Sequence, residues 1–457
     1  MNPSPQVAVV GLGVNNRPLV PYLLSKGLQV IVADKRPIEN LRESLAAMGL
    51  ADKVVILGGD TYLTDLARIQ NIARVYLTPG MVKTLPPIHQ LRQQGAYITC
   101  ETDVFLQHCP APIIGITGSA GKTTTTTLVT EALREDGQYS IFVGGNIGHS
   151  LWEDLDKITI QSRVIMELSS FQLELVEHSP QGAVILNLSP NHLDIHGSMA
   201  AYAAAKSNIF RYQQTDNWVL LPYPPTLLDF MDTEPPGRVL YFATTDHGAP
   251  GTFISHGWIM FRDFSSTVSP CFPLSWIQLP GNHNVLNVLA AVAVVKMAGG
   301  STSAMGRTVQ RFQGVPHRLE KVRKHDNILY INDSIATAPD RTIAALRAIT
   351  DPIVLLAGGY DKHLDYDELG QVIAGSSVHH VIVLGQVQEK LAQAIGRHGN
   401  IPVLRAETFD MAVDMARLVA NPGDTVLLSP AAASYDMFQN FEERGQRFRD
   451  LVNRFGR

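Results

Sequence analysis

The sequence predicts an α/β protein of three domains, each built around a mainly parallel sheet. Apolar strand patterns alternate with helical patterns along most of the chain, which is typical of parallel sheets. The chain has 457 residues, too many for one core and about the length of three ordinary domains. Proline-containing joints at 108–112 and 313–316 predict domains over 1–110, 111–315 and 316–457.

The first domain opens with a nucleotide-binding pattern. A strand at 6–10 leads to Gly11-Leu12-Gly13, a helix near 19–26, and a strand at 29–33 that ends at Asp34. This is the first half of a Rossmann-like unit, although Asn16 stands where the third glycine is usual. Asp34 lies where an acid often contacts a ribose. A dinucleotide and a nucleotide sugar are both compatible, because the turn would bind a pyrophosphate in either.

The second domain carries the pattern of a triphosphate-binding loop. An apolar strand at 112–117 is followed by a glycine-rich turn with Gly121-Lys122-Thr123 and then a helix. Lys122 could reach the β- and γ-phosphates, and the hydroxyl of Thr123 could bind Mg²⁺. The usual pattern has glycine five residues before Gly121, where this chain has Ile116. A nucleoside triphosphate is therefore the expected ligand.

Other features of the second domain have ordinary structural explanations as well as functional ones. Glu167 ends a strand beside the loop and could be a second Mg²⁺ ligand, although such acids are often only solvated strand ends. His192 lies in a turn, and Lys206 on an alanine-rich helix would normally be a solvated charge. Residues 221–280, rich in proline and aromatic residues, predict a small β appendage or longer insertions.

The third domain reads as a parallel, doubly wound sheet. Its predicted strands lie at 328–331, 353–357, 381–384 and 425–428, with helices at 340–349, 387–397, 409–420 and 439–455. Three polar or small-residue turns, at 332–334, 358–362 and 429–434, follow strands. Because α/β sheets bind ligands at the carboxyl ends of their strands, these turns should share one rim and form a second substrate site.

Composition narrows the class of protein. The net charge of −5 gives no sign of a nucleic-acid surface, and no apolar run reaches membrane-spanning length. Three scattered cysteines argue against a disulfide framework or a zinc site and predict a location in the reducing cytoplasm. The sequence leads directly into a strand pattern, which predicts no signal peptide.

A series of short motifs occurs in a specific order along the chain. They are Thr117–Thr124, Gly144–Gly148, Glu167–Glu174, His192–Asp194, Tyr202 with Lys206, Gly281–Asn284, Pro316–Arg318 and Asn332–Ser334. Together they resemble the Mur ligase family, the ATP-dependent amino-acid ligases of peptidoglycan synthesis, over essentially the whole chain. The short first domain and the turns at 358–362 and 429–434 look most like the member that adds D-glutamate.

The resemblance implies an ATP-dependent, amide-forming ligase. It would add D-glutamate to UDP-N-acetylmuramoyl-L-alanine through an acyl phosphate and a tetrahedral intermediate, in cytoplasmic peptidoglycan precursor synthesis for cell-wall biogenesis and cell division. The implied cofactors are ATP and Mg²⁺ at two sites. The implied partners are the two substrates alone, without nucleic acid or membrane, and the protein is expected to be a monomer.

The resemblance also implies roles for individual residues. Catalysis would use Lys122, His192 and Lys206, and the Mg²⁺ ligands would be Thr123, Glu167, His192 and carbamylated Lys206. ATP would contact Gly118, Ser119, Ala120, Gly121, Lys122, Thr123, Thr124, Asn284, Asn287, Arg318 and Asp333. The UDP-muramoyl substrate would contact Val14, Asn15, Asp34, Lys35, Arg36, Thr78, Gly80, Asn146 and Ser169. D-Glutamate would contact Thr337, Lys362, Ser434, Tyr435 and Phe441.

The chain departs from the family pattern at three places. Asn16 replaces a glycine of the uridine loop, and Ser119-Ala120 replaces the more usual Thr-Asn of the phosphate loop. Ile335 stands where the D-glutamate-adding member often has lysine, close to the expected acceptor site. The offset glycine of the phosphate loop is no departure, because Thr117-Gly-x-x-Gly-Lys-Thr is the family form.

Three other functions remain as alternatives. A sister Mur ligase or a folylpolyglutamate-type ligase would use a different acceptor, although the nucleotide-type first domain argues against the folate branch. A nucleotide-binding switch without ligase chemistry would leave the third-domain turns and the His192–Lys206 pair unexplained. A dinucleotide-dependent oxidoreductase rests on Gly11-x-Gly13 alone.

Overall fold

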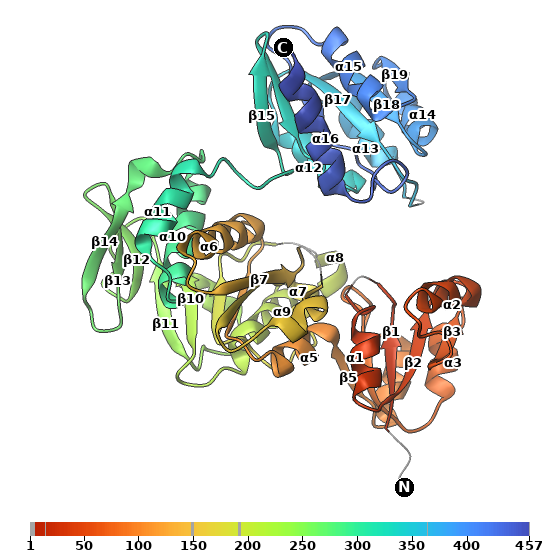
Figure 1. Ribbon diagram of the computed structural model, residues 1–457, viewed down its shortest axis with the longest axis vertical. Helices are drawn as coiled ribbons and strands as arrows, with labels where there is room; N and C mark the ends of the chain where they lie inside the picture. Colours follow the sequence, from red (N-terminus) through yellow and green to blue (C-terminus); the bar gives the residue numbers. More distant parts are fainter. Residues whose placement is uncertain (1–4, 14, 148–149, 191–192, 363, 457) are drawn as a thin grey trace. The chain divides into compact units, whose positions relative to one another are not determined.

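Three mainly parallel sheets organise the chain. The computed structural model describes residues 5–13, 15–147, 150–190, 193–362 and 364–456. It divides into two compact units, Met1–Phe312 and Gln313–Arg457. The first contains sheets of five and nine strands and the second a sheet of six, each flanked by helices (Figure 1). The predicted three-domain α/β class is confirmed. Within the described ranges, no helix is long and apolar enough to cross a membrane.

The first sheet is entirely parallel, in the order β3-β2-β1-β4-β5. Its strands are β1 (Gln6–Val10), β2 (Gln29–Asp34), β3 (Val54–Gly58), β4 (Ile72–Leu77) and β5 (Tyr97–Cys100). Its helices are α1 (Leu19–Ser25), α2 (Ile38–Ala46), α3 (Tyr62–Arg68), α4 (Pro86–Gln93) and α5 (Glu101–His108). Val7 and Val9 pack on one face and Ala8 and Val10 on the other. Burial of both faces explains the continuous apolar pattern of these strands.

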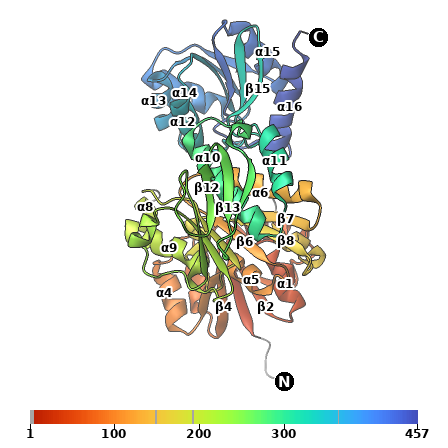
Figure 2. The same ribbon diagram turned by 90° about the vertical axis from the view of Figure 1, so that its left-hand side faces the viewer.

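The central sheet has the order β14-β13-β12-β11-β10-β9-β6-β8-β7. Its first strands are β6 (Ile113–Thr117), β7 (Ser140–Gly145), β8 (Ser162–Glu167), β9 (Gly182–Ile185) and β10 (Trp218–Pro222). Its helices are α6 (Lys122–Asp136), η1 (Leu151–Lys157), α7 (Ser170–Leu173), α8 (Leu193–His196), α9 (Met199–Arg211), η2 (Thr226–Phe230), η3 (Leu274–Trp276), α10 (Asn282–Met297) and α11 (Thr302–Arg311). Helices α6 and α10 lie side by side against this sheet (Figure 2).

Residues 221–280 extend the central sheet instead of forming a separate appendage. They contribute β11 (Arg238–Phe242), β12 (Gly251–Ser255), β13 (Trp258–Arg262) and β14 (Val268–Pro273). Strand β11 pairs in parallel with β10, with Trp218 opposite Arg238, and β12 pairs in parallel with β11. Strands β13 and β14 are then added by antiparallel pairing. The short apolar runs were recognisable as strands, but parallel pairing leaves no turn signal that would place them beside β10.

The third sheet has the order β15-β16-β20-β17-β18-β19, with only β15 antiparallel among its described pairings. Its strands are β15 (Glu320–His325), β16 (Ile328–Asn332), β17 (Ile353–Gly358), β18 (Val378–Leu384), β19 (Val403–Ala406) and β20 (Thr425–Leu428). Its helices are α12 (Pro339–Ala348), α13 (Asp367–Ala374), α14 (Gln388–His398), α15 (Phe409–Val419) and α16 (Phe441–Arg454). The four predicted strands and four predicted helices are present. Strands β15 and β19 lie at the sheet edges and were missed, because edge strands are short or rich in charge. Helix α13 was also missed.

The three polar turns of the third sheet share one rim, as predicted. Strands β16, β20 and β17 are parallel neighbours, so their carboxyl ends point the same way. The hydroxyl of Ser429 donates a hydrogen bond of 2.8 Å to the carboxylate of Asp333. The amide of Gly358 donates one of 2.8 Å to the carbonyl of Pro430. Each turn is therefore tied directly to a neighbour.

Candidate active site

The phosphate loop joins β6 to α6 in a conformation that requires glycine. Gly121 has φ +83° and lies directly before the helix. A Cβ atom there would lie 2.3 Å from Oδ1 of Asn287, a contact no real side chain makes. The loop therefore packs closely against α10, and it brings the predicted residues Gly118 to Thr124 together at the start of α6.

The two unusual residues of the loop make specific contacts. Oγ of Ser119 donates to the carbonyl of Ser189 and accepts from its amide, both at 2.9 Å, and lies 3.0 Å from the hydroxyl of Tyr202. The amide of Ala120 donates to Oδ1 of Asn187 at 2.8 Å. The segment after β9 thus holds the loop, and Ser119 and Ala120 preserve its shape despite departing from the usual residues.

The two polar residues at the start of α6 differ in exposure. Nζ of Lys122 donates to the carbonyl of Gly118 at 2.9 Å, so the ammonium group lies back over the loop. Thr123 is buried at the first turn of the helix. A helix N-terminus, a lysine and a hydroxyl beside one another form an arrangement that binds anionic phosphates and a hydrated cation.

Glu167 ends β8, the strand that pairs with β6 just before the phosphate loop. It pairs with Ile116 of β6 and is 2 % exposed. Its Oε1 accepts a hydrogen bond of 3.0 Å from Nδ2 of Asn146. Its Oε2 is buried and has no hydrogen-bond partner among the described residues. A buried, unsatisfied carboxylate oxygen is costly and suits a bound cation, so the residue fits a Mg²⁺ site.

Lys206 is buried, contrary to the ordinary expectation for a lysine on an alanine-rich helix. It is 1 % exposed on α9, and its Nζ donates to Oγ1 of Thr117 at 3.1 Å and to the carbonyl of Gly118 at 3.2 Å. Burial and then the charge of Lys122 lower the pKa of Lys206 to about 7, although Glu167 acts in the opposite direction. The amine is therefore partly neutral near neutral pH.

Other predicted residues of the central domain have structural partners. Ser169 caps α7 through a capping box with Gln172, the structural role that such a residue commonly has. Asn284 donates to the carbonyl of Pro280 at 2.8 Å, and its Oδ1 accepts from Asn287 at 3.2 Å. His192 lies outside the described residues. In the part of the chain that is described, no cluster of three His, Cys, Asp or Glu side chains could hold a metal.

The first-domain residues that were predicted to bind the uridine nucleotide lie at the carboxyl ends of the strands of its sheet. Oδ2 of Asp34 accepts from the amide of Leu12 at 2.7 Å, and Nη2 of Arg36 donates to the carbonyl of Leu12 at 2.9 Å. Burial opposes ionisation of Asp34, but hydrogen bonds from Arg36 and Leu12 outweigh it and lower the pKa of the carboxyl. Thr78 packs on Gly11, where a Cβ atom would lie 2.9 Å from the threonine side chain.

The remaining residues of this edge follow the same turns. Asn15 and Lys35 lie in the turns after β1 and β2, and Gly80 in the turn after β4 with φ +83°. Val14 lies outside the described residues. Asn16 is buried, and its Nδ2 donates to the carbonyls of Val10 and Gly11 at 3.2 and 2.9 Å. The asparagine thereby satisfies main-chain acceptors that a glycine would leave to other groups.

A buried carboxylate, Asp333, and a buried guanidinium group, Arg444, lie at the rim of the third sheet. Asp333 is 4 % exposed and accepts from the amide of Leu319 at 3.1 Å as well as from Ser429. Burial raises the pKa of Asp333 to about 6, even though these hydrogen bonds favour its ionised form. Arg444 of α16 is 3 % exposed and donates to Ser334 and to the carbonyl of Ala432.

The residues predicted to bind the acceptor amino acid follow the strands of this rim or begin α16. Thr337 follows β16, Lys362 follows β17, Ser434 and Tyr435 follow β20, and Phe441 starts α16. Nζ of Lys362 lies 5.8 Å from the ring centroid of Tyr435. The main-chain carbonyl of Phe441 accepts from Oγ of Ser334 at 2.8 Å. Arg318 lies directly before Leu319, which donates to Asp333.

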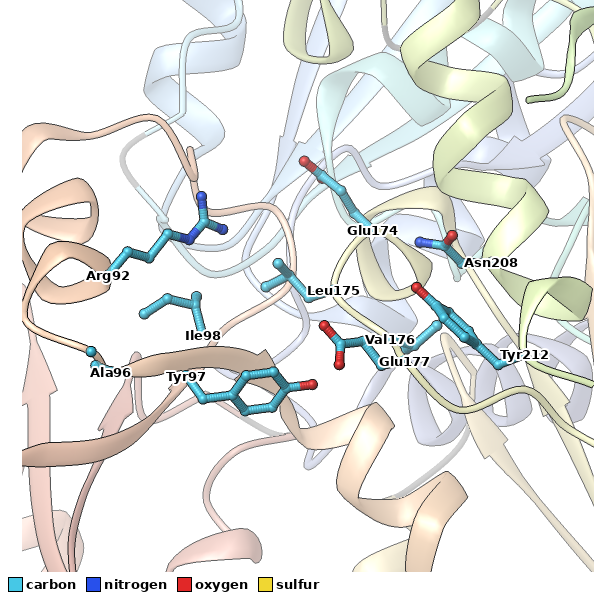
Figure 3. Close-up of a pocket in the computed structure, with 11 residues that line it drawn as sticks. Arg92, Ala96, Tyr97, Ile98, Glu174, Leu175, Val176, Glu177, Asn208 and Tyr212 are labelled. Atoms are coloured by element: carbon cyan, nitrogen blue, oxygen red, sulfur yellow. The ribbon is translucent and has the colours of Figure 1, made fainter. Parts of the chain in front are cut away.

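A separate cavity lies within the first unit, between the first and central sheets. It has a volume of 520 Å³ and contains none of the predicted site residues (Figure 3). Its lining residues are Arg92, Gly95, Ala96, Tyr97, Ile98, Glu174, Leu175, Val176, Glu177, Asn208 and Tyr212. Nearby, the carboxylate of Asp103 accepts from the amides of Glu177 and His178 at 2.7 and 3.0 Å. Helix α5, which connects the first sheet to the central sheet, is therefore hydrogen-bonded to the segment at 177–178 beside the cavity.

Sequence reasoning missed several residues that shape the site. Asn187 holds the phosphate loop, and only its place after a strand beside that loop could have suggested it. Arg444 carried no signal, because an arginine in a polar helix is ordinarily exposed. His196 stacks on Phe171, and its Nε2 lies 2.9 Å from Oγ of Ser170. These roles depend on burial and on contacts between distant segments.

Three family models match the chain. They are the MurD-like N-terminal domain of Mur ligases over residues 5–100, the Mur ligase middle domain over 116–295 and the Mur ligase glutamate ligase domain over 317–432. In fold, the chain is similar to UDP-N-acetylmuramate-alanine ligase MurC of Thermotoga maritima, with a TM-score of 0.50 at 16 % identity over 98 % of this chain and 99 % of the other. It is also similar to MurF of Acinetobacter baumannii, with 0.50 at 18 % identity over 97 % and 90 %.

Curated relatives are more similar in sequence. A UDP-N-acetylmuramoylalanine–D-glutamate ligase of Symbiobacterium thermophilum is 43 % identical over 450 residues, which cover 98 % of this chain and 97 % of that protein. One of the same name from Acetivibrio thermocellus is 40 % identical, over 98 % and 96 % of the two chains. The alignments extend through all three sheets. The chain therefore belongs to the Mur ligase family.

Proposed function

We propose that the protein is an ATP-dependent ligase that joins D-glutamate to UDP-N-acetylmuramoyl-L-alanine, in the cytoplasmic synthesis of peptidoglycan precursors. The observation that carries the proposal is the meeting of the phosphate loop, Glu167 and buried Lys206 at one edge of the central sheet. The full-length relatives, named for this reaction, supply the choice of substrates.

The central domain would bind ATP. The amides of Gly118 to Thr124 and the ammonium group of Lys122 would bind its phosphates. Thr123 and Glu167 would hold Mg²⁺, which would neutralise phosphate charge when bound. The unsatisfied Oε2 of Glu167 supports this assignment. Asn284 and Asn287, which lie beside the loop, would contact adenine.

Lys206 would provide an oxygen ligand for a second Mg²⁺ after reaction with CO₂. The carbon of CO₂ forms a bond to the neutral amine, one proton is lost, and the product carries an anionic oxygen. Mg²⁺ prefers oxygen ligands, whereas a protonated lysine has only donors. Burial and a pKa of about 7 support this reaction at Lys206. His192 would complete the second metal site.

The outer domains would bind the two organic substrates. The edge of the first sheet, with Asp34 and Arg36, would bind the uridine nucleotide, and Asn146 and Ser169 would lie near its muramoyl part. The rim of the third sheet would bind D-glutamate through the residues around Lys362. Arg318 and Asp333 would contact ATP. In this assignment residues 1–110 would bind mainly the uridine nucleotide, 111–315 mainly ATP and 316–457 mainly D-glutamate.

The reaction class follows from these substrates. The alanyl carboxylate would take the γ-phosphoryl group of ATP, and the amine of D-glutamate would then replace phosphate to form the amide. Lys122 would offset the negative charge that gathers on the transferred group. The developing oxyanion of the second step would need similar stabilisation.

Phosphate release tests the proposed function. We expect rapid release only when ATP, UDP-N-acetylmuramoyl-L-alanine and D-glutamate are all present, because the acceptor amine is needed to complete each turnover. Omission of either organic substrate should leave only background hydrolysis. Equal hydrolysis without the UDP-sugar would instead indicate a nucleotide-binding switch and would contradict the proposal.

A further inference from the structure

Three cationic side chains border the rim of the third sheet: Arg341 on α12, Lys362 after β17 and Arg444 on α16. They come from elements that are distant in sequence. Burial, followed by the charges of Arg341 and then Arg444, lowers the pKa of Lys362, so all three charges act on one small region. A region of this kind is suited to an anionic ligand. The three cations differ in how many of their donors are available to such a ligand.

Each of the three nitrogens of the Arg444 guanidinium group donates a hydrogen bond to the protein. Its Nε and Nη2 donate to Oγ and the carbonyl of Ser334 at 3.0 and 2.9 Å, and its Nη1 donates to the carbonyl of Ala432 at 3.1 Å. The guanidinium group is also buried. Arg444 therefore connects the turns after β16 and β20, and its role is to hold the rim in shape.

Arg341 is placed differently. It is exposed in the first turn of α12. Among the described residues its guanidinium makes one hydrogen bond, a long one of 3.4 Å from Nη1 to the carbonyl of Ile335. A guanidinium group has five donors in a planar fork that matches a carboxylate. Most of these donors are therefore available to a ligand.

The turn that Arg341 contacts has no positive charge of its own at Ile335. Ile335 stands in the turn after β16, and its side chain is apolar. An isoleucine cannot attract a carboxylate, so the turn itself carries no cation at that place. Arg341 lies against the main chain of the same residue and brings a positive charge to it from the next helix.

We infer that Arg341 binds a carboxylate of the acceptor amino acid and supplies, from α12, the positive charge that Ile335 does not. Arg341 is thereby a residue that determines the preference for an acidic acceptor. The inference deepens the proposed function and rests on it. A charge-assisted hydrogen bond from arginine to carboxylate provides both affinity and orientation.

Steady-state kinetics of four variants test the inference. Arg341→Ala should raise the KM for D-glutamate about 10- to 100-fold, the range for loss of hydrogen bonds to a charged group. The KM values for ATP and for UDP-N-acetylmuramoyl-L-alanine should stay within about twofold, a change of under 0.5 kcal/mol. Arg347→Ala, an exposed arginine on the same helix, should leave all three values unchanged. Arg341→Lys should retain part of the affinity.

The double variant Ile335→Lys with Arg341→Ala distinguishes a local charge from a general structural effect. It should recover D-glutamate affinity relative to Arg341→Ala, because the cation returns to the turn. An unchanged KM for D-glutamate in Arg341→Ala, or equal rises in all three KM values, would overturn the inference while leaving the proposed function standing. Absence of D-glutamate-dependent turnover in the unaltered protein would overturn both.

Discussion

Replacing Lys206 with alanine is expected to reduce the rate of ligation more than about 100-fold, since even residues that only support metal ligands contribute 10- to 100-fold. The carbamate oxygen would be lost, and with it one ligand of the second Mg²⁺. Short carboxylates such as formate or acetate should restore part of the rate, because they can place an anionic oxygen in the space that the side chain leaves. The measurement is the rate of phosphate release with and without these anions.

The pKa of Lys206 adds a pH dependence with a definite sign. CO₂ reacts with the neutral amine, and a pKa of about 7 makes that form grow as pH rises from about 6 to about 8. Ligation should therefore increase with pH over this interval in the wild-type protein when CO₂ is limiting. A carbamate carbon signal from ¹³C-labelled CO₂ should be present in the wild-type protein and absent in Lys206→Ala.

Two further variants serve as controls for Lys206. Lys206→Arg keeps a positive charge but forms no carbamate, and we expect it to be as inactive as the alanine variant. Lys157→Ala, which removes an exposed lysine, should have full activity. Full activity of Lys206→Ala, or a ¹³C signal that persists in it, would contradict the carbamate assignment.

Replacing Lys122 with alanine is expected to lower kcat/KM for ATP by about 100- to 1,000-fold, the usual effect of removing one donor that stabilises transition-state charge. Unlike the loss at Lys206, this one should not respond to carboxylates, because a cation is missing. The substitution should also raise the pKa of Lys206, which the charge of Lys122 now helps to lower. The pH profile of the carbamate signal would show that shift.

Thermal unfolding shows whether Lys122→Ala loses activity through the missing charge or through a loss of folding. Lys122 is partly exposed at the start of α6, so its removal costs its hydrogen bonds to the carbonyls of Gly118 and Ser119 but leaves the sheet and the hydroxyl contact of Ser119 with Ser189 in place. Thermal unfolding should therefore be almost unchanged. If Lys122→Ala kept its ATP-dependent rate within a fewfold of wild type, the phosphate loop would not have the role given to it here.

Most of the architecture could be predicted from the sequence, because strand and helix patterns depend on neighbouring residues in the chain. Strand β6, the glycine turn and α6 follow directly from residues 112–133, and the shared rim follows from the general rule for parallel sheets. The position of residues 221–280 did not follow, because β11 pairs with β10 in parallel and no turn signal in the sequence marks such a pairing. Edge strands such as β15 gave a weak signal because they are short or rich in charge.

The site was less predictable than the fold because burial cannot be read from residue type. Lys206 reads as a solvated charge and Arg444 as an ordinary helical arginine, yet both are enclosed by segments distant in sequence. Asn16 reads as a defect in a glycine pattern, and in the structure it satisfies two main-chain carbonyls. The roles of individual residues toward ligands remain predictions for the experiments described above.

A panel of acceptor amino acids tests the central claim most directly. The purified protein would be incubated with ATP, Mg²⁺, UDP-N-acetylmuramoyl-L-alanine and one of D-glutamate, L-glutamate, L-alanine or diaminopimelate, and the product would be identified by mass spectrometry. We predict that D-glutamate alone gives rapid turnover and a product heavier by one glutamyl residue. Efficient use of another acceptor in preference to D-glutamate would contradict the account.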